Sequence, residues 1–327
     1  MDNHPVSANL LGLFFHVDGK QLQEQYKNHL SDFHDWDQKH HAENWTLFPQ
    51  NISEHLSIDE TSFSNGDLYT IVSSKSAKGR KGTILATIKG TKAEDIIRVL
   101  ERIPSRSRNK VREVTMDMAP NMAKAIRRCF RNSRRVIDRF HVQKLAYDAV
   151  QELRIKYRWE VLDEESRAIA EARKQGNPYE PELLSNGDSI KQLLARSRHL
   201  LFKHSSRWTE SQKHRAELLF LRFPKLKKAY DIGIALGDIF NKCKDKTLAF
   251  TKLGLWHNQV ENSGILSFES VARSIAAHHP EILHYFDNRS TNASAESFNA
   301  KLKAFRSVFR GVRDTTFFLY RVMKLYA

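Results

Sequence analysis

Residues 56–74 read LSIDETSFSNGDLYTIVSS and hold two segments of alternating apolar and polar side chains. The segments LSIDETSF and DLYTIVSS are separated by SNG, which is typical of a tight turn between antiparallel strands. In the first segment the alternation places Ser57 and Asp59 on one face and Leu56 and Ile58 on the other. The stretch therefore predicts a β-hairpin that begins a sheet with an acidic side chain on one of its faces.

Further strand-like segments follow at 82–90, 111–119 and 134–140. Helical patterns at 92–103 and 120–130 separate these three segments from one another. The order of elements predicts an α/β fold with a mixed sheet flanked by helices. Three strands come first in hairpin succession, and a helix, a strand, a helix and a strand follow. Before the sheet, polar residues with periodic apolar positions predict one amphipathic helix from Gly19 to Trp45.

From Val142 the strand signal disappears and helix-like patterns take over. They cover residues 142–175, 189–203, 209–222, 225–242, 245–261 and 268–286. An all-helical block of about 145 residues is too long to be a loop, so it predicts an inserted domain. The stretch from Asn292 to Arg313 follows it and is predicted to form the last helix, with Asn292 or Ser294 as its N-cap.

The 327-residue chain carries 53 Lys and Arg against 38 Asp and Glu, a formal net charge of +15. Such an excess favours a polyanionic partner, because basic side chains release counterions from phosphates. The two cysteines, Cys129 and Cys243, are too few for a disulfide framework or a four-cysteine zinc site and suit a reducing cytosol. No segment reaches membrane-spanning length, so we expect a cytoplasmic protein without a membrane partner.

Three acids occupy positions that suit a sheet-based site: Asp59 in the first strand, Asp117 near the end of the fourth, and Glu296 at the head of the basic last helix. Converging carboxylates repel one another unless a cation holds them together. Mg²⁺ prefers such oxygen ligands, and a pair of ions can promote phosphodiester chemistry. Each acid taken alone is more often a surface charge, and Glu296 also complements the dipole of its helix.

Four segments resemble the transposases of bacterial insertion sequences of the ISL3 group, and within it the two-reading-frame ISAon1-like branch. They are IDETSFSNGDLYTIV (58–72), VTMDMAPNMAKAI (114–126), VIDRFHVQKLAYDAVQELR (136–154) and RSTNASAESFNAKLKAFRSVFRGVRDTTFFLYRV (289–322). The resemblance implies a ribonuclease-H-like core whose DDE triad falls on Asp59, Asp117 and Glu296. It also implies Mg²⁺ or Mn²⁺ as cofactor, with two ions in the site.

The Asp-x-x-His element of such families matches Asp138 and His141, which are expected to support the triad, as is Asn299 one turn after Glu296. A histidine between a strand and a helix is also commonly a structural hydrogen-bonding group. The predicted DNA contacts are the turn residues Lys75, Lys78, Arg80 and Lys81, the helix residues Lys301, Lys303, Arg306 and Arg310, and Trp159. Related transposases stack a flipped base on an aromatic of the insertion, although most tryptophans are core residues.

The expected domains are an N-terminal helical region (1–50), the first part of the core (51–141), the helical insertion (142–287) and helices that complete the core (288–327). The predicted activity is DNA 3′-end cleavage and strand transfer of an insertion sequence. Expected partners are the element ends, the target DNA and further copies of the chain. The protein is expected to associate with the bacterial nucleoid when it is bound to DNA. A separate small protein is the alternative to residues 19–45 for end recognition. An inactive DNA-binding regulator and a structure-specific nuclease on the same fold are the other interpretations.

Overall fold

A computed structural model describes residues 1–64, 66–309 and 314–327, without the side chains of Phe63 and Ser64. The chain forms two compact units. The sheet unit comprises Met1–Asp138 and Asn288–Ala327, and the helical unit comprises Arg139–Asp287.

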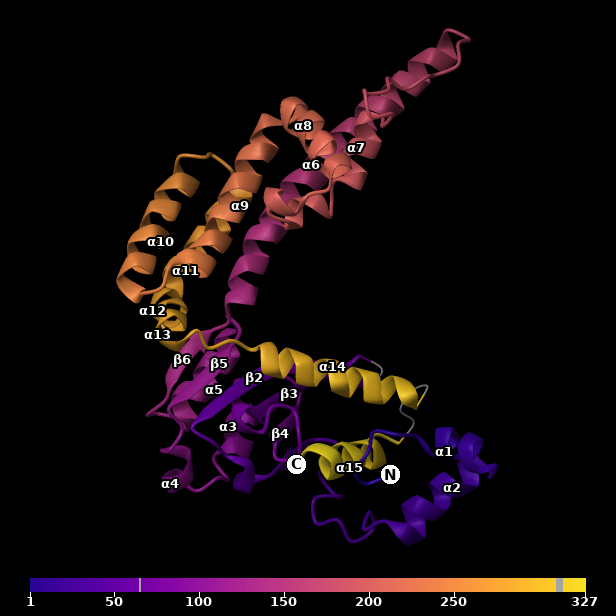
Figure 1. Cartoon of the computed structure of the whole chain (residues 1–327), viewed down its shortest axis with the longest axis vertical. Coiled ribbons are helices and arrows are strands. Elements are labelled where there is room, and N and C mark those ends of the chain that lie inside the picture. Colours follow the sequence, from indigo (N-terminus) through magenta and orange to yellow (C-terminus); the bar gives the residue numbers. More distant parts are fainter. Residues whose placement is uncertain (65, 310–313) are drawn as a thin grey trace. The chain divides into compact units, whose positions relative to one another are not determined.

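The sheet unit is built on a six-stranded mixed sheet (Figure 1). Its strands are β1 (Trp45–Leu47), β2 (His55–Ser64), β3 (Asp67–Ser74), β4 (Ile84–Lys89), β5 (Glu113–Met116) and β6 (Arg134–Ile137), in the order β1-β4-β3-β2-β5-β6. The pairs β1–β4, β3–β4 and β2–β3 are antiparallel, whereas β2–β5 and β5–β6 are parallel. This arrangement confirms the predicted α/β class with a ribonuclease-H-like core.

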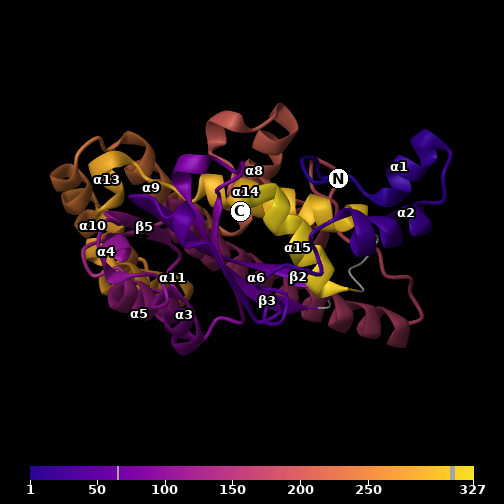
Figure 2. The same cartoon turned by 90° about the horizontal axis from the view of Figure 1, so that it is seen from below.

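The two faces of this sheet are covered by different helices (Figures 1 and 2). On one face, Leu56 and Ile58 of β2 join the core cluster formed with α3 (Ala93–Leu100) and α5 (Pro120–Cys129). On the other, Tyr69 and Ile71 of β3 pack in the cluster that holds α14 (Ala293–Val308) and α15 (Thr315–Tyr326). The period-2 alternation of β2 and β3 therefore separates the layers, and the face with Asp59 is the one that α14 covers.

The prediction of a single helix from Gly19 to Trp45 is wrong. The structure has α1 (Ala8–Phe15) and α2 (Gly19–Gln25), and one π-helical turn continues α2 to Leu30. Ser31 is extended and turns follow, until Trp45 pairs with Ile88 as the start of β1. Tertiary packing overrides the helical pattern here, because Tyr26 and Phe33 are drawn into a cluster with Phe317 and Tyr320 of α15.

Two further boundaries differ from the sequence-based prediction. The helix that begins after Asn292 ends at Val308 and is not the last, because α15 follows with Asp314 as its N-cap. The strand predicted at 134–140 ends at Ile137, since residues from Arg139 onward already belong to a helix. Short helical elements join the strands elsewhere in the sheet unit, at Pro49–Asn51, Lys75–Ala77 and Ser105–Arg108 (α4).

The helical unit contains only helices and loops, apart from one isolated bridge between Leu183 and Ser189. Its elements are α6 (Arg139–Lys174), α7 (Ile190–Arg196), α8 (Glu210–Arg222), α9 (Pro224–Lys242), α10 (Lys246–Glu261), α11 (Leu266–Ala277), α12 (His279–Leu283) and α13 (Tyr285–Asn288), with 3-10 turns at Leu200–Phe202 and Ser205–Arg207. Capping boxes at Ser189 and Thr209 fix the starts of α7 and α8. Helices thus occupy most of the ranges predicted for this block.

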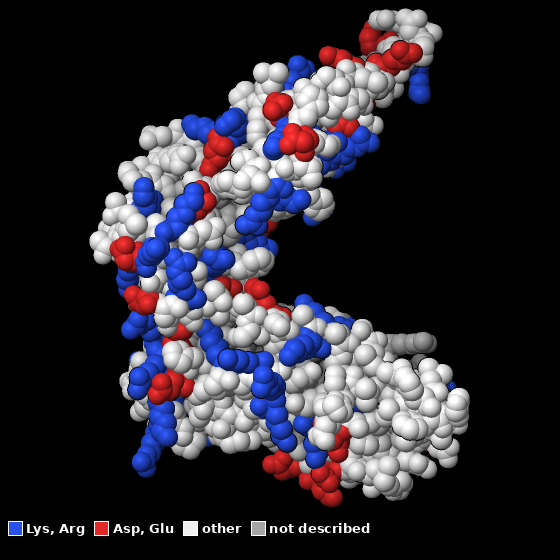
Figure 3. All heavy atoms as spheres, in the orientation of Figure 1, with Lys and Arg blue, Asp and Glu red and all other residues white. Residues whose placement is uncertain are grey.

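Acidic side chains are frequent toward the C-terminal end of α6, and Figure 3 shows acidic and basic side chains interspersed over the visible face of the helical unit. In the part of the chain that the structure describes, every helix is too short or too polar to cross a bilayer.

Candidate active site

Asp59 and Asp117 stand at equivalent positions of two neighbouring parallel strands. Ser57 of β2 pairs with Thr115 of β5, and each aspartate follows its paired residue by two positions. Neighbouring strands lie about 4.8 Å apart, so the backbones of the two aspartates are held close together. Both side chains are half-buried, and each accepts a local backbone hydrogen bond, from Glu60 and Ala119 respectively.

Asp138 extends the row to the next strand. Met116 of β5 pairs with Ile137 of β6, and Asp117 and Asp138 directly follow these two residues. Three adjacent parallel strands therefore carry aspartates at corresponding positions, within β2 and directly after β5 and β6, toward the carboxyl ends of β5 and β6, where open α/β sheets bind ligands. Asp138 is the most enclosed of the three, with a relative exposure of 2%.

The fourth acid comes from α14. Glu296 lies in the first turn of this helix and is exposed. One of its carboxylate oxygens lies within 4.8 Å of a carboxylate oxygen of Asp138. One turn later, the amide of Asn299 donates a 2.7 Å hydrogen bond to the carboxylate of Asp59. The helix thus hydrogen-bonds Asp59 and brings Glu296 near Asp138, and Asn299, which is 6% exposed, fixes its register over β2.

The negative charge at this edge affects a neighbouring carboxyl group, that of Glu60. The pKa of Glu60, the neighbour of Asp59, is raised first by burial and then by the negative charges of Asp117 and Asp59. This repulsion is what a divalent cation relieves, and the donors are carboxylate oxygens, which suit Mg²⁺ or Mn²⁺. The residues present therefore fit a divalent metal site.

Asp138 is the member of this group whose position beside Glu296 the sequence did not predict. The family resemblance implies only a supporting role for it, yet the structure places its carboxylate beside Glu296. The available signal was the IDRFH motif (137–141), which overlaps the end of the strand predicted at 134–140. His141, from the same motif, lies half-buried in the first turn of α6 and belongs to the helical unit.

The predicted basic contacts divide into exposed and buried groups. Lys78, Arg80 and Lys81 are exposed on the turn between β3 and β4. Lys301 and Lys303 are exposed on α14, and Lys301 donates a 3.2 Å hydrogen bond to the carbonyl of Gly79 in that turn. The turn and α14 are therefore in contact, and both expose basic side chains in the sheet unit.

Three predicted DNA contacts behave differently. Lys75 points into the sheet unit, with a side-chain exposure of 15%. Arg306 is half-buried and donates to the carbonyl of Ser62 at 3.4 Å. Arg310 lies outside the described residues.

Trp159 lines a cavity of about 470 Å³ in the helical unit and is 63% exposed. Three guanidinium groups line the same cavity, from Arg154, Arg158 and Arg198. Arg154 is 5% exposed and donates to the carbonyl of Leu194, and its pKa is lowered by burial and by the two neighbouring arginines. The cavity therefore combines an accessible indole with concentrated positive charge.

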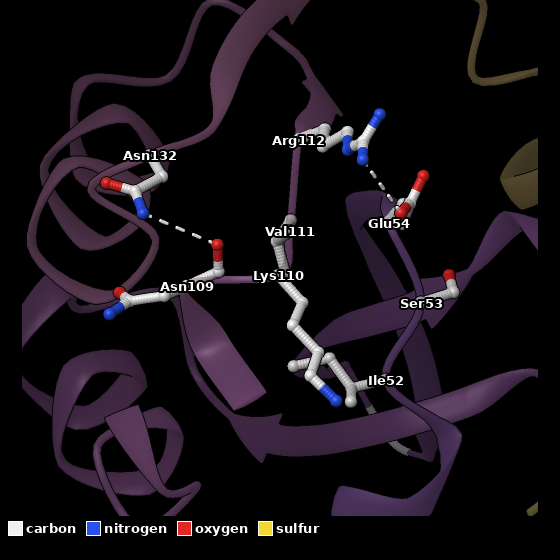
Figure 4. Close-up of a pocket in the computed structure, with 8 residues that line it drawn as sticks. All are labelled: Ile52, Ser53, Glu54, Asn109, Lys110, Val111, Arg112 and Asn132. Carbon is white, nitrogen blue, oxygen red and sulfur yellow. Dashed lines mark hydrogen bonds and ion pairs between the residues drawn. The ribbon is translucent and has the colours of Figure 1, made fainter. Parts of the chain in front are cut away.

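A second cavity, of about 340 Å³, lies at the opposite ends of β2, β5 and β6 from the acids (Figure 4). Arg112 and Glu54 form an ion pair of 3.4 Å on its wall, and Asn132 donates to the carbonyl of Asn109 at 3.4 Å. Because this cavity begins where the strands begin, it is separate from the acidic edge.

A family model described as Transposase, for the DDE enzymes of the ISL3 group, matches residues 56–322. The matched range includes all the acids described above. No curated protein and no solved structure matches the chain.

Proposed function

Because the chain belongs to the ISL3 family of transposases, we propose that it cuts DNA at the 3′ ends of an insertion sequence and joins those ends to target DNA. Family membership supports a DNA-acting transposase that uses a divalent metal. The observation that carries the finer proposal is the row of Asp59, Asp117 and Asp138 on adjacent strands, with Glu296 beside the last of them.

In this proposal Asp59, Asp117 and Glu296 would hold two Mg²⁺ or Mn²⁺ ions, and Asp138 would contribute to the same site. When bound, the metal supplies Lewis-acid activation of the attacking hydroxyl and stabilises charge on the leaving oxygen. Asn299 orients the carboxylate of Asp59 through its hydrogen bond. His141 remains a candidate supporting group.

The chemistry consists of two phosphoryl transfers. In the first, water attacks the phosphorus at the element end, and the P–O3′ bond breaks to leave a 3′-hydroxyl on the element and a 5′-phosphate on the flank. In the second, that 3′-hydroxyl attacks a target phosphodiester, whose own P–O3′ bond breaks and releases a target 3′-hydroxyl. Neither step needs an external energy source, and each depends mainly on placement of the reacting groups.

DNA binding is assigned to the exposed basic side chains of the β3–β4 turn and of α14, namely Lys78, Arg80, Lys81, Lys301 and Lys303, with Arg306 on the same helix. Their exposure and the contact of Lys301 with Gly79 support this assignment. Trp159 with its three arginines is proposed to bind an unpaired nucleotide, whose base stacks on the indole and whose phosphate meets the guanidinium groups.

Two partner proposals accompany this function. Two element ends must be held together, so copies of the chain are expected to associate on DNA. A separate small protein would supply end recognition if this chain alone does not. The proposed setting is the bacterial cytoplasm, with nucleoid association when DNA is bound.

The test is a strand-cleavage assay with Mg²⁺, a labelled duplex from the end of the element that encodes the chain, and a target plasmid. Joined products support transposition. Cuts without joining favour the nuclease, and binding alone favours the regulator. Asp117→Asn is expected to abolish cutting while the dissociation constant for DNA stays within about twofold, because only the chemical step needs the carboxylate. An unchanged cleavage rate in that variant would refute the proposed site.

A further inference from the structure

Lys75 lies in a polar cluster inside the sheet unit. Its ammonium group donates to the hydroxyls of Thr115 and Ser290 and lies 3.7 Å from the carboxylate of Glu113. Burial lowers the pKa of Lys75, and the charges of Glu113 and Asp138 oppose that shift. Its donors are thus directed to internal partners, which is not what a residue that contacts DNA phosphates requires.

Glu113 forms the acidic half of this cluster. Burial, at 4% exposure, would raise the pKa of this carboxyl, but hydrogen bonds from Ser290 and Asn288 and the charges of Lys75 and His55 outweigh burial and lower the pKa. The amide of Asn288 donates to Glu113 at 2.7 Å. The segment that precedes α14 is therefore attached to β5 through Asn288 and Ser290.

This attachment continues into the first turn of α14. Asn292 is fully buried and donates to the carbonyl of Ile58 in β2, at 3.4 Å. The carbonyl of Asn292 in turn accepts the backbone N–H of Glu296 at 2.8 Å. Residues 289–292 have no helix or strand of their own, so these side-chain contacts are what connect the start of α14 to the strands that carry the acids.

We propose that Lys75, Glu113, Thr115, Asn288 and Ser290 form a polar clasp that positions Glu296 over the strand aspartates. Lys75 and Glu113 are accordingly positioning residues, which act on the metal site through α14. A long lysine from the β3–β4 turn reaches both β5 and the segment before α14, and so joins three parts of the chain that are distant in sequence. The catalytic consequence rests on the function proposed above, whereas the structural consequence does not.

The first test compares Lys75→Met with Lys78→Met, two removals of one charge from the same turn. Lys75→Met is expected to lower cleavage of element-end DNA about 10- to 100-fold and to raise the Mg²⁺ concentration for half-maximal rate several-fold, because displacement of one ligand by about 1 Å has effects of this size. Its affinity for DNA should stay within about twofold. Lys78→Met should instead weaken DNA binding and leave the Mg²⁺ midpoint unchanged.

The second test is hydrogen exchange, which needs no activity. In Lys75→Met, amides of residues 293–299 are expected to exchange at least about tenfold faster, whereas Lys78→Met should match the wild type. Ser290→Ala removes one hydroxyl of the clasp and is the milder variant should Lys75→Met fail to fold. Lys75→Arg should restore most of the protection, since it keeps the cation.

The outcomes separate the two proposals. Unchanged exchange in α14 for both Lys75→Met and Ser290→Ala would overturn the clasp, as would a loss of DNA affinity in Lys75→Met with an unchanged Mg²⁺ midpoint. If α14 exchanges faster in the variants but the wild-type protein cuts no DNA, the clasp is supported and the proposed function is rejected. Faster exchange together with a raised Mg²⁺ midpoint would support both.

Discussion

The amide of Asn299 donates a 2.7 Å hydrogen bond to the carboxylate of Asp59, across 240 residues of sequence. This contact joins the helix that carries Glu296 to the strand that carries the first aspartate. The sequence only suggests that Asp59 and Glu296 belong to one site. The hydrogen bond shows that their strand and helix lie against each other.

Asn299→Ala is expected to reduce cleavage about 10- to 100-fold, because a hydrogen bond to a charged group contributes about 1.5–3 kcal/mol. Single-turnover cleavage of element-end DNA at saturating Mg²⁺ measures the effect. Lys303→Ala, which shortens an exposed side chain one turn further along α14, is the matched control and should affect mainly DNA binding. Equal cleavage rates in Asn299→Ala and wild type would show that the contact is catalytically silent.

Asp138→Asn is expected to lower cleavage at least about tenfold and to raise the Mg²⁺ requirement, because its carboxylate lies within 4.8 Å of that of Glu296. A Mg²⁺ titration of the cleavage rate checks this. The control is Glu54→Gln, an acid before β2 at the opposite end of the same sheet, which should leave both values unchanged. If Asp138→Asn cuts DNA normally, the site consists of the three acids predicted from sequence.

Replacement of Lys78, Arg80 and Lys81 by Gln is expected to weaken DNA binding and to flatten its salt dependence. Each phosphate contact that is lost should reduce the slope of log K against log [salt] by about 0.9. Fluorescence anisotropy between about 50 and 200 mM salt measures the slope. Substitution of Lys124 and Arg128, which lie on α5 and pair with Glu94 and Glu101, serves as the comparison and should not alter it.

Asp188 is predicted to stabilise the helical unit in a pH-dependent manner. Its side chain is 1% exposed and pairs with Arg196 and Arg215. Burial would raise the pKa of Asp188, but these arginines outweigh it and hold the pKa below its ordinary value of 3.8. The stabilisation is therefore fully present above about pH 4 and is lost as pH falls through the lower, folded-state pKa.

Asp188→Asn should accordingly destabilise the helical unit by about 1.5–3 kcal/mol at pH 7, since it removes the charge from a buried carboxylate that two partly exposed arginines hydrogen-bond. Denaturant unfolding between pH 3 and 7 measures the free energy of unfolding of the variant and of the wild type. The difference between these two free energies should become smaller as the pH falls. Lys213→Met breaks only the exposed pair with Glu210 and should cost under about 1 kcal/mol. If the difference in free energy of unfolding between Asp188→Asn and wild type does not change with pH, the stabilisation by Asp188 does not depend on its charge.

Local patterns predicted the elements of the sheet that have strong alternation. The hairpin at 56–74 and the helices α3 and α5 follow from side-chain period and turn residues, because these depend on near neighbours in the chain. The region 19–45 shows the limit of such patterns. Its helical periodicity is overridden by aromatic packing of Tyr26 and Phe33 on α15, a helix near the other end of the chain.

Sequence patterns were sufficient for β2 to β6, for the helices between them and for acids on successive strands, because period and composition are properties of neighbouring residues, but they missed β1. Three-dimensional packing was needed to establish that Asp138 lies beside Glu296 and that Lys75 faces inward to Glu113 and Ser290. A charged side chain looks the same in sequence whether it faces water or a buried partner. Its environment depends on which distant strands the parallel pairing of β2, β5 and β6 brings together.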